Sequence, residues 1–485
     1  MPASVQAVPR VSAEIFVLPL EEGRYLVYAP LRRAAFIANA KVVRFLAELE
    51  AGALDEAADP DGSLVQFLRS LEILDAPPEN LPIATFQGNP EPILVTLLLT
   101  TACNLRCTYC YASAGDTPVK SMTLEAAEQG IDYVAANALK RRNPHFEVAY
   151  HGGGEPAMNW ALLTGTLEYA KQKAAQTGLE LRSSLATNGV MADQQIDWVT
   201  ANINGASVSF DGLPEVHDKH RLTKTGKASS HLVIHTLRRF DEAHYPYSLR
   251  VTATADQISR LPESVEFICA NFRPNGIQIE PVYQLGRWQG GPSAETADFI
   301  AAFRAAQQRA ARHGREISFS AARLGTLTNH FCGLSQDNFC LSPEGRVTAC
   351  YEVFWDGHPW SRLFFYGQPD RENGGYRFDM QVLENLRAQA VQNRACCQGC
   401  FAKWTCAGDC YHKSVDLHGE RSEFVGAGRC LVTRELTKDL ILARIAASGG
   451  LFWREPGRPG ACPTPCPGTS LAGRGPAPRT EEPPA

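Results

Sequence analysis

Between residues 93 and 313 the chain alternates six times between a short apolar run and a helix-length stretch. The pairs are 93–99 with 123–140, 147–150 with 160–176, 181–186 with 193–202, 206–210 with 231–241, 249–254 with 262–271, and 277–282 with 294–313. Continuous apolar strands separated by helices predict a parallel sheet that helices cover on its faces. Six units predict either a doubly wound sheet or an incompletely closed barrel. In both folds ligands bind at the carboxyl ends of the strands.

The segments on either side of this repeat have a different character. Before it, strands at 14–18 and 24–29 and helices at 41–50 and 62–74 predict a small α+β domain that a proline-rich stretch closes. After it, cysteines are dense, and the final residues are rich in Pro, Gly and Ala, a composition that cannot bury a core. We therefore expect four parts: an N-terminal domain at 1–88, a core at 89–325, a Cys-rich domain at 326–448 and a disordered tail at 449–485.

The overall composition is that of an ordinary globular protein. A net charge of −5 over 485 residues gives no reason to expect nucleic acid or an acidic membrane as partner. The longest apolar runs are strand-sized, far short of a membrane span. No basic segment followed by an apolar core marks a signal peptide near Met1. These features predict a cytoplasmic protein.

Clustered cysteines break this ordinary picture. Of 15 cysteines, twelve fall into three groups, namely 103/107/110, 332/340/350, and 396/397/400/406/410 with 430 beyond. In a cytosolic chain such clusters indicate metal ligands rather than disulfides. Cys269 lies in an apolar helical stretch and is expected to be a buried thiol. Cys462 and Cys466 lie in the tail and are interpreted as free thiols.

The first group, Cys103-x3-Cys107-x2-Cys110, comes directly after the first predicted strand. Three thiolates on one loop can each bind one iron of a [4Fe–4S] cube and leave the fourth iron open to a small chelating molecule. A zinc site is the alternative, but it commonly uses four ligands, and no fourth Cys or His is nearby. The spacing therefore favours an iron–sulfur cluster.

This motif resembles the one that defines the radical S-adenosylmethionine (SAM) superfamily. The resemblance implies a partial (β/α)6 TIM-like barrel in which Cys103, Cys107 and Cys110 hold a cluster that cleaves SAM reductively. The resulting 5′-deoxyadenosyl radical would abstract a hydrogen from the substrate. Tyr109 occupies the position where the family packs an aromatic ring near the adenine.

Further motifs at later strand ends agree with this resemblance. The segment 152–156 resembles the family's GGEP motif, in which Gly153 and Gly154 allow close approach and Glu155 pairs with the ammonium group of the cofactor. Residues 184–189 resemble an S-x-x-T-N-G motif that reaches the ribose. The other expected cofactor contacts are Ser184, Thr187, Asn188, Ser209, Asp211 and Arg221, and the resemblance places Arg221 near the cofactor carboxylate. Ordinary turns and a surface salt bridge are the alternatives for these segments.

Eight later cysteines suffice for two more [4Fe–4S] cubes at four thiolates each, with structural zinc ribbons as the alternative. Their arrangement resembles the SPASM extension of radical enzymes that modify peptides and proteins. The resemblance assigns auxiliary cluster I to Cys332, Cys340, Cys350 and Cys410. It assigns auxiliary cluster II to Cys397, Cys400, Cys406 and Cys430, with Cys396 able to replace Cys397. The complete fold expectation is thus α/β, a partial barrel with a small N-terminal α+β domain and a Cys-rich SPASM domain, holding three clusters.

The substrate is less constrained than the chemistry. One hypothesis is a peptide maturase that introduces a crosslink, thioether or epimerised centre into a ribosomally made precursor. Residues 1–88 of this chain would then bind the leader of that precursor. Another is an anaerobic sulfatase-maturating enzyme, in which an Asp base follows the cysteine that matches Cys350. Here Tyr351 follows, which is a poor base, and Glu352 is the candidate instead. A flavodoxin or ferredoxin would supply electrons, and a zinc-binding scaffold is the non-enzymatic alternative.

Overall fold

A computed structural model describes residues 11–51, 59, 61–116, 118–288, 295–372, 374–418 and 428–455, with only the backbone at 416–418. The chain divides into two compact units. The first, here called the barrel unit, comprises Phe86–Ser320 and Cys332–Ala388. The second, here called the terminal unit, comprises the described residues before 86, Ala321–Phe331 and the described residues from Gln389 onward. This division differs from the expected one, because the segment 326–448 contributes to both units.

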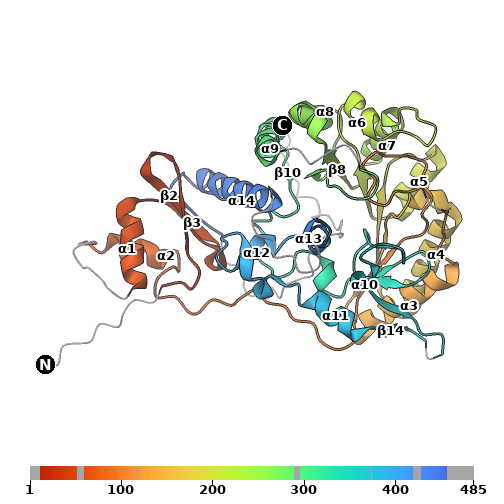
Figure 1. Cartoon of the computed structure of the whole chain (residues 1–485), viewed down its shortest axis with the longest axis horizontal. Helices are drawn as coiled ribbons and strands as arrows, with labels where there is room; N and C mark the ends of the chain where they lie inside the picture. The colour runs from red at the N-terminus through yellow and green to blue at the C-terminus, as the bar shows by residue number, and fades with distance from the viewer. Residues whose placement is uncertain are drawn as a thin grey trace, which may run out of the picture. The chain divides into compact units, whose positions relative to one another are not determined.

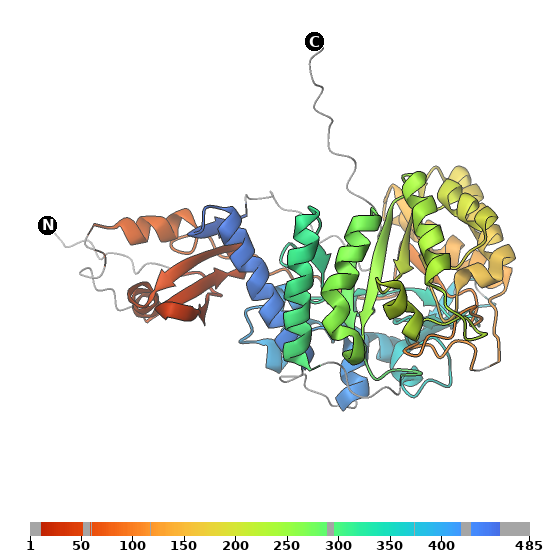
Figure 2. The same ribbon diagram turned by 90° about the horizontal axis from the view of Figure 1, so that it is seen from above.

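Six parallel strands form the centre of the barrel unit, and they hydrogen-bond in chain order. The strands are β4 (Leu94–Leu97), β5 (His145–Tyr150), β6 (Glu180–Thr187), β7 (Gly205–Ser209), β8 (Tyr247–Ala253) and β9 (Ile277–Pro281). The helices that follow them in turn are α3 (Leu124–Lys140), α4 (Trp160–Thr177), α5 (Asp193–Asn202), α7 (Ser230–Glu242), α8 (Leu261–Asn271) and α9 (Thr296–Arg312). Each predicted strand–helix pair is present, and a short helix α6 (Pro214–His220) is added. Figure 1 shows the helices outside the strands, and Figure 2 shows α8 and α9 side by side.

Helix α3 illustrates how local sequence sets these elements. The Thr123 side chain caps its first turn by accepting a hydrogen bond from the backbone N–H of Ala126 at 3.2 Å. Ala127, Ile131 and Val134 lie on one buried face at helical spacing. The apolar face therefore packs on the sheet while the polar face meets solvent.

The barrel does not close on itself. The strand next to β4 is β11 (Cys340–Leu341), which pairs with it in parallel and is followed by the antiparallel strands β12 (Val347–Thr348), β13 (Phe365–Pro369) and β14 (Tyr376–Phe378). At the opposite edge β10 (Ile317–Ser318) pairs with β9. Two short helices, α10 (Ser361–Phe364) and α11 (Met380–Arg387), complete the unit. The predicted open barrel is confirmed, and part of the Cys-rich region extends its sheet.

An antiparallel sheet in the order β1-β2-β3-β15 lies in the terminal unit. Its strands are β1 (Phe16–Pro19), β2 (Arg24–Ala29), β3 (Ala34–Asn39) and β15 (Phe452–Arg454), and its helices are α1 (Ala40–Glu50), α2 (Ser63–Ser70), α12 (Lys403–Cys406), α13 (Tyr411–His418) and α14 (Gly428–Ala447). Buried Val27, Phe36, Phe45 and Leu68 form its core. β1, β2, α1 and α2 lie where the sequence predicts them, whereas β3 and β15 were not predicted.

β15 lies within the segment that we expected to be a disordered tail. It pairs antiparallel with β3, placing Trp453 opposite Ala35, and the Trp453 ring is buried. Residues 456–485, which include Cys462 and Cys466, lie outside the described residues. The structured part of the chain thus extends at least to residue 455.

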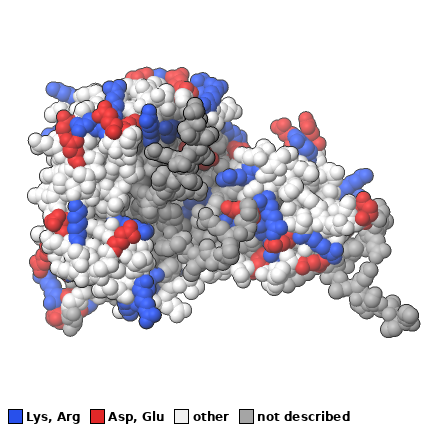
Figure 3. Space-filling view, turned by 180° about the vertical axis from the view of Figure 1, so that it is seen from behind, with Lys and Arg blue, Asp and Glu red and all other residues white. Residues whose placement is uncertain are grey.

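The surface carries mixed charge. Figure 3 shows acidic and basic side chains interspersed over the face that it presents. None of the helices in the described ranges is both long and apolar enough to span a membrane.

Candidate functional site: a cysteine loop at the carboxyl ends of the parallel strands

The loop after β4 carries the predicted triad Cys103, Cys107 and Cys110. Backbone hydrogen bonds join it to the segment after α6, because Arg106 N donates to Leu222 O at 2.7 Å and Thr108 N donates to His220 O at 2.9 Å. The loop is therefore pinned between two strand ends, where parallel α/β folds place their ligands.

Arg287, which sequence reasoning missed, braces the same loop from the loop after β9. Its Nη1 donates to Cys107 O at 2.8 Å, and its backbone N donates to Cys110 O at 3.0 Å. A bidentate ion pair at 2.8 Å with Asp116 fixes the guanidinium group. No local pattern marks this arginine, because its partners lie about 170–180 residues earlier in the chain.

The triad thiols are free and partly buried. Burial, with the Glu155 carboxylate as the next cause, raises the pKa of the Cys103 thiol to about 12, and burial raises the pKa of Cys107 to about 11. Binding of a metal would therefore have to displace their protons. Among the described residues, the triad sulfurs belong to no group of three Cys, His, Asp or Glu ligand atoms that all lie within 4.8 Å of one another.

Glu155 is the centre of a buried network beside the triad. Its carboxylate accepts hydrogen bonds from Thr187 Oγ1 at 2.8 Å, from Asn188 N at 2.7 Å and from Ala157 N at 3.2 Å. Burial nevertheless raises its pKa to about 7. Asn188 Nδ2 in turn lies 3.7 Å from Cys103 Sγ as a donor. Three sequence-predicted residues thus meet at the cysteine loop.

Gly154 and Gly153 are required by close packing around this network. A Cβ atom on Gly154 would lie 2.1 Å from Ala102 O, and one on Gly153 would lie 2.7 Å from the Phe354 ring. The neighbouring Glu155 N donates to Ala102 O at 2.8 Å. The glycines therefore let the Glu155 segment lie directly against the residues that lead into the triad.

A second cluster joins Tyr109, Asp211 and Arg221. The Tyr109 hydroxyl donates to Asp211 Oδ2, Arg221 Nε donates to the same oxygen at 3.0 Å, and the guanidinium carbon lies 5.1 Å from the Tyr109 ring centre. Although burial acts to raise it, the pKa of Asp211 lies below its usual value because Arg221 and His217 stabilise the carboxylate. All three predicted residues therefore meet within the barrel unit, where Asp211 and Arg221 are buried and Tyr109 is half-buried.

The predicted serines lie apart from these networks. Ser184 on β6 and Ser209 on β7 are half-buried on strand positions that alternate with buried neighbours. The structure does not join either side chain to the Glu155 or Asp211 clusters among the described residues. Their cofactor roles stay a prediction.

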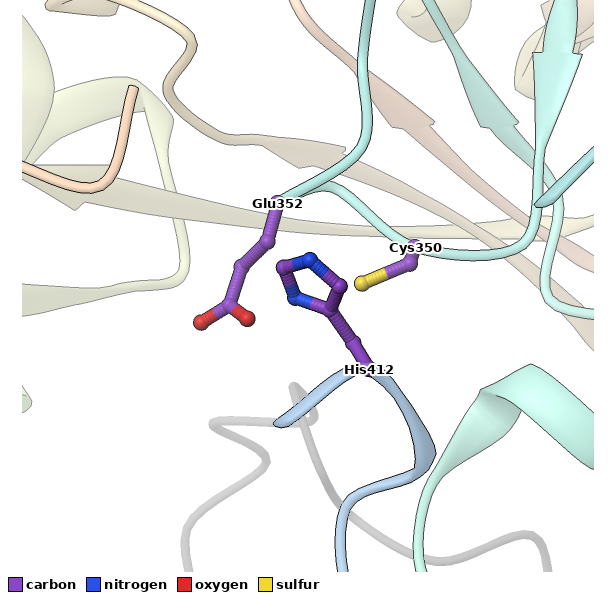
Figure 4. A group of neighbouring side chains, drawn as sticks. All are labelled: Cys350, Glu352 and His412. Carbon is purple, nitrogen blue, oxygen red and sulfur yellow. The ribbon is translucent and has the colours of Figure 1, made fainter. Parts of the chain in front are cut away.

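Three of the later cysteines belong to the barrel unit. Cys340 is buried in β11 opposite Thr96 of β4, while Cys332 and Cys350 are partly buried in adjoining loops. Glu352 leaves the same loop as Cys350, as Figure 4 shows. The third residue labelled there, His412, belongs to α13 in the terminal unit. The base role of Glu352 stays a prediction.

The remaining predicted ligands belong to the terminal unit and are Cys397, Cys400, Cys406, Cys410 and Cys430. Burial is the largest cause that raises the pKa of three of these thiols, and neighbouring groups raise it further. Cys396 and Cys400 raise the pKa of Cys397. Asp409 and then Cys430 raise the pKa of Cys406, and Asp409 and then Cys400 raise the pKa of Cys430. These four cysteines of predicted cluster II therefore lie in one group, and Cys396 lies beside Cys397 with 3.8 Å between their sulfurs. Whether Cys410 belongs to cluster I stays a prediction.

Two inward-facing residues of the barrel unit also escaped prediction. The His151 ring stacks on Tyr351, with ring centres 4.2 Å apart and planes at 27°. Arg250 is an exposed charge in the middle of β8. Both could have been suspected from sequence, because His151 directly precedes the glycine run and Arg250 interrupts an apolar strand.

Comparisons with known proteins agree with this geometry. Residues 97–266 match the family model described as the Radical SAM superfamily. The serine-type anaerobic sulfatase-maturating enzyme of Klebsiella aerogenes is 25% identical over 358 residues, which cover 68% of this chain and 83% of the relative. The sporulation killing factor maturation protein SkfB of Bacillus subtilis is 26% identical over 274 residues, 53% of this chain and 60% of the relative.

Solved structures share the fold. The structure described as native anSMEcpe with bound AdoMet and Cp18Cys peptide matches with a TM-score of 0.57 at 18% identity, covering 73% of this chain and 99% of the other. At this identity the likeness shows a shared fold over the matched part of the chain.

Proposed function

Residues 97–266 form a radical SAM domain, and on that premise we propose that the chain is an enzyme that modifies a residue of a ribosomally synthesised peptide. A crosslink, a thioether and an epimerised centre are the modifications that suit this chemistry. The similarity to a maturation protein for a killing factor supports a peptide substrate. So does the Cp18Cys peptide in a structure of the same fold.

The observation that carries the proposal is the meeting of the cysteine loop with the Glu155 network. Cys103, Cys107 and Cys110 would hold a [4Fe–4S] cluster, and Glu155 would face the ammonium group of SAM. Thr187 and Asn188 orient the Glu155 carboxylate through their hydrogen bonds. Arg221 brings positive charge toward the cofactor carboxylate, and Ser209 would add a hydroxyl donor. When bound, the cluster and SAM supply a 5′-deoxyadenosyl radical that abstracts a hydrogen atom from the substrate.

Anaerobic reconstitution tests this assignment. The full chain would be loaded with iron and sulfide, reduced in the presence of SAM and assayed for 5′-deoxyadenosine by chromatography. We expect release of 5′-deoxyadenosine from the wild type and none from the Cys103→Ala, Cys107→Ala, Cys110→Ala variant. A chain that retains zinc, without iron or sulfide, and that forms no 5′-deoxyadenosine would instead be a zinc-binding scaffold.

We extend the proposal to two auxiliary [4Fe–4S] clusters. The grouped thiols of Cys397, Cys400, Cys406 and Cys430 support the second of them. Three clusters correspond to about twelve irons per chain. Electrons would come from a flavodoxin or ferredoxin, which a reduced-protein assay in place of a chemical reductant would test.

The leader of the precursor peptide would bind the sheet of the terminal unit. β15 pairs with β3 at one edge, whereas β1 pairs only with β2 among the described strands. Val17 at this edge is 38% exposed. An extended peptide can add a strand to such an edge through main-chain hydrogen bonds. Proline substitution at Val17 should then weaken leader binding in a fluorescence anisotropy titration.

Sulfatase maturation is a second candidate, which the similarity to the Klebsiella enzyme favours. Against it stands Tyr351, since burial raises its pKa further above the ordinary value for a phenol and so makes it a poor base. Glu352 would then have to accept the proton. Mass spectrometry of a sulfatase peptide after reaction would decide, because formylglycine formation changes the mass of one Cys or Ser.

A further inference from the structure

Arg250 projects from the face of the parallel sheet opposite to the one on which α7 packs. Along β8 the odd-numbered positions are buried, and Tyr247 lies 5.7 Å from Phe240 of α7 between ring centres. That face is therefore the helix-covered one, and Arg250 faces the opposite, inner side. The sheet register places Ser209 of β7 and Gln278 of β9 beside it, so its immediate neighbours are polar and uncharged.

The guanidinium group of Arg250 has no acidic partner in the part of the chain that the structure describes, and the residue is exposed. Because the residue is exposed, water can hydrate this charge until a ligand replaces the water, so a protein carboxylate is not required beside it. The other charged clusters of this unit are paired internally, as in Arg221 with Asp211 and Arg287 with Asp116. Arg250 thus differs from them in having its charge available to a ligand.

A stacked pair of rings also senses the charge of Arg250. The stacked His151 and Tyr351 rings lie within its electrostatic reach, since burial first and then Arg250 lower the pKa of His151 to about 4. Tyr111 donates its hydroxyl to Gly152 O at 2.8 Å next to this pair. His151 is therefore neutral at pH 7. Glu352 is an acidic group whose charge acts on the pKa of both rings.

We propose that Arg250 binds a carboxylate of the peptide substrate inside the barrel and so selects peptides with an acidic group near the residue that is modified. The planar guanidinium can hold a carboxylate through two parallel hydrogen bonds, and the neutral His151–Tyr351 stack can pack against the adjoining residue. An Asp or Glu side chain and a C-terminal carboxylate share this chemistry. The proposal rests on the proposed function, since it takes a peptide as substrate.

Selection from a peptide library tests Arg250 directly. The reconstituted full-length enzyme would be incubated anaerobically with SAM, without reductant, and with a randomised hexapeptide library that is amidated at its C-terminus. A second library would carry free C-termini. Bound peptides would be identified by mass spectrometry. We expect roughly tenfold enrichment of Asp and Glu in the first library if the side chain is bound, or of free over amidated peptides if the C-terminus is bound.

Matched variants separate charge recognition from structural damage. Arg250→Gln should abolish the acidic preference, Arg250→Lys should keep part of it, and Arg250→Glu should shift selection toward Lys and Arg. Arg238→Gln, on the exposed face of α7, is the control and should select as the wild type does. Iron content and circular dichroism would verify that each variant is folded and loaded.

Two outcomes would overturn the proposal. One is an acidic preference that is equal in the wild type and in Arg250→Gln, or absent from both. The other is weaker SAM binding in Arg250→Gln with unchanged peptide selection, which would assign the arginine to the cofactor. Because the selection needs no turnover, a failure of 5′-deoxyadenosine formation in a parallel assay would refute the proposed radical function separately.

Discussion

The two cysteine-rich regions of the chain are held in different ways. In the barrel unit the triad lies on a loop between strand ends, and main-chain hydrogen bonds from Arg106, Thr108 and Glu155 attach it to its neighbours. In the terminal unit the grouped cysteines lie on α12, α14 and the turns before them, and a buried ion pair between Arg429 and Asp409 adjoins them. The first site is thus attached by main-chain hydrogen bonds. At the second, Arg323 donates side-chain hydrogen bonds to Thr405 O and Cys406 O, both at 3.2 Å, in addition to a main-chain bond from Thr328 N to Trp404 O at 2.9 Å.

Replacing the cysteine ligands should give the largest difference between the two regions. In the Cys103→Ala, Cys107→Ala, Cys110→Ala variant we expect 5′-deoxyadenosine formation to fall by roughly 1,000-fold or more, because the open iron that binds the cofactor is lost. Cys400→Ala should retain part of this cleavage while product formation falls. Parallel assays of 5′-deoxyadenosine and of peptide mass measure both. Equal loss of cleavage in the two variants would show that the regions are not functionally separate.

A buried ion pair in the terminal unit should be more sensitive to loss of one charge than an exposed pair in the barrel unit. Asp409 and Arg429 form a buried ion pair at 2.6 Å, so Asp409→Asn removes the carboxylate charge that faces the guanidinium group in this pair. We expect a loss of about 3–5 kcal/mol in the free energy of unfolding of this region. Asp193→Asn, at an exposed pair on α5, should cost far less, because solvent screens exposed ion pairs. Denaturant titrations would compare the two variants, with the protection of the Cys430 thiol from a thiol reagent as the local readout.

Glu155 gives the barrel site a pH signature. Its pKa is raised from 4.5 to about 7, so the folded apoprotein binds a proton more tightly than the unfolded chain. The stabilising effect is complete below about pH 4.5 and is lost as the pH rises through 7, by roughly 3 kcal/mol at most. In Glu155→Gln this contribution should vanish. Unfolding free energies of both apoproteins at pH 5 and 7.5 measure the difference, and parallel pH profiles would contradict it.

The smallest expected effect comes from adding a single methyl group beside the cysteine loop. Gly154→Ala places its Cβ 2.1 Å from Ala102 O, so the cysteine loop must move, at a cost of about 1–3 kcal/mol and with reduced iron retention. Gly325→Ala, which meets nothing within 4 Å, is the matched control and should be neutral. Thermal unfolding and iron analysis check both variants. Unimpaired iron binding in Gly154→Ala would show that the close contact is dispensable.

The fold of the barrel was predictable because its signals are local. Apolar runs of strand length and capped helices such as the one after Thr123 recur at regular spacing, and each motif residue follows a strand. Glu155, Thr187 and Asn188 could therefore be expected to meet, and the structure confirms that they do.

The rest depends on long-range pairing that leaves little local trace. β11 has only two residues, too few to show alternation, and it is a strand because β4 offers it an edge. Arg287 braces the triad from a loop about 180 residues away. The spacing of the later cysteines reflects the metal groups that they would bind rather than a periodic backbone, so their division between two units could not be read from sequence.

The pairing of β15 with β3 and of β11 with β4 has a consequence for how the chain is made. β4 leaves the ribosome about 240 residues before its neighbour β11, and β3 precedes β15 by about 400 residues. At about 5–20 residues per second these edges stay open for roughly 10–80 seconds of synthesis. An apolar strand edge left unpaired for so long is open to wrong partners. A chain that stops before residue 340 therefore has the β11 edge of β4 uncovered, next to the loop that bears the triad, and the antiparallel sheet cannot be finished until β15 is made.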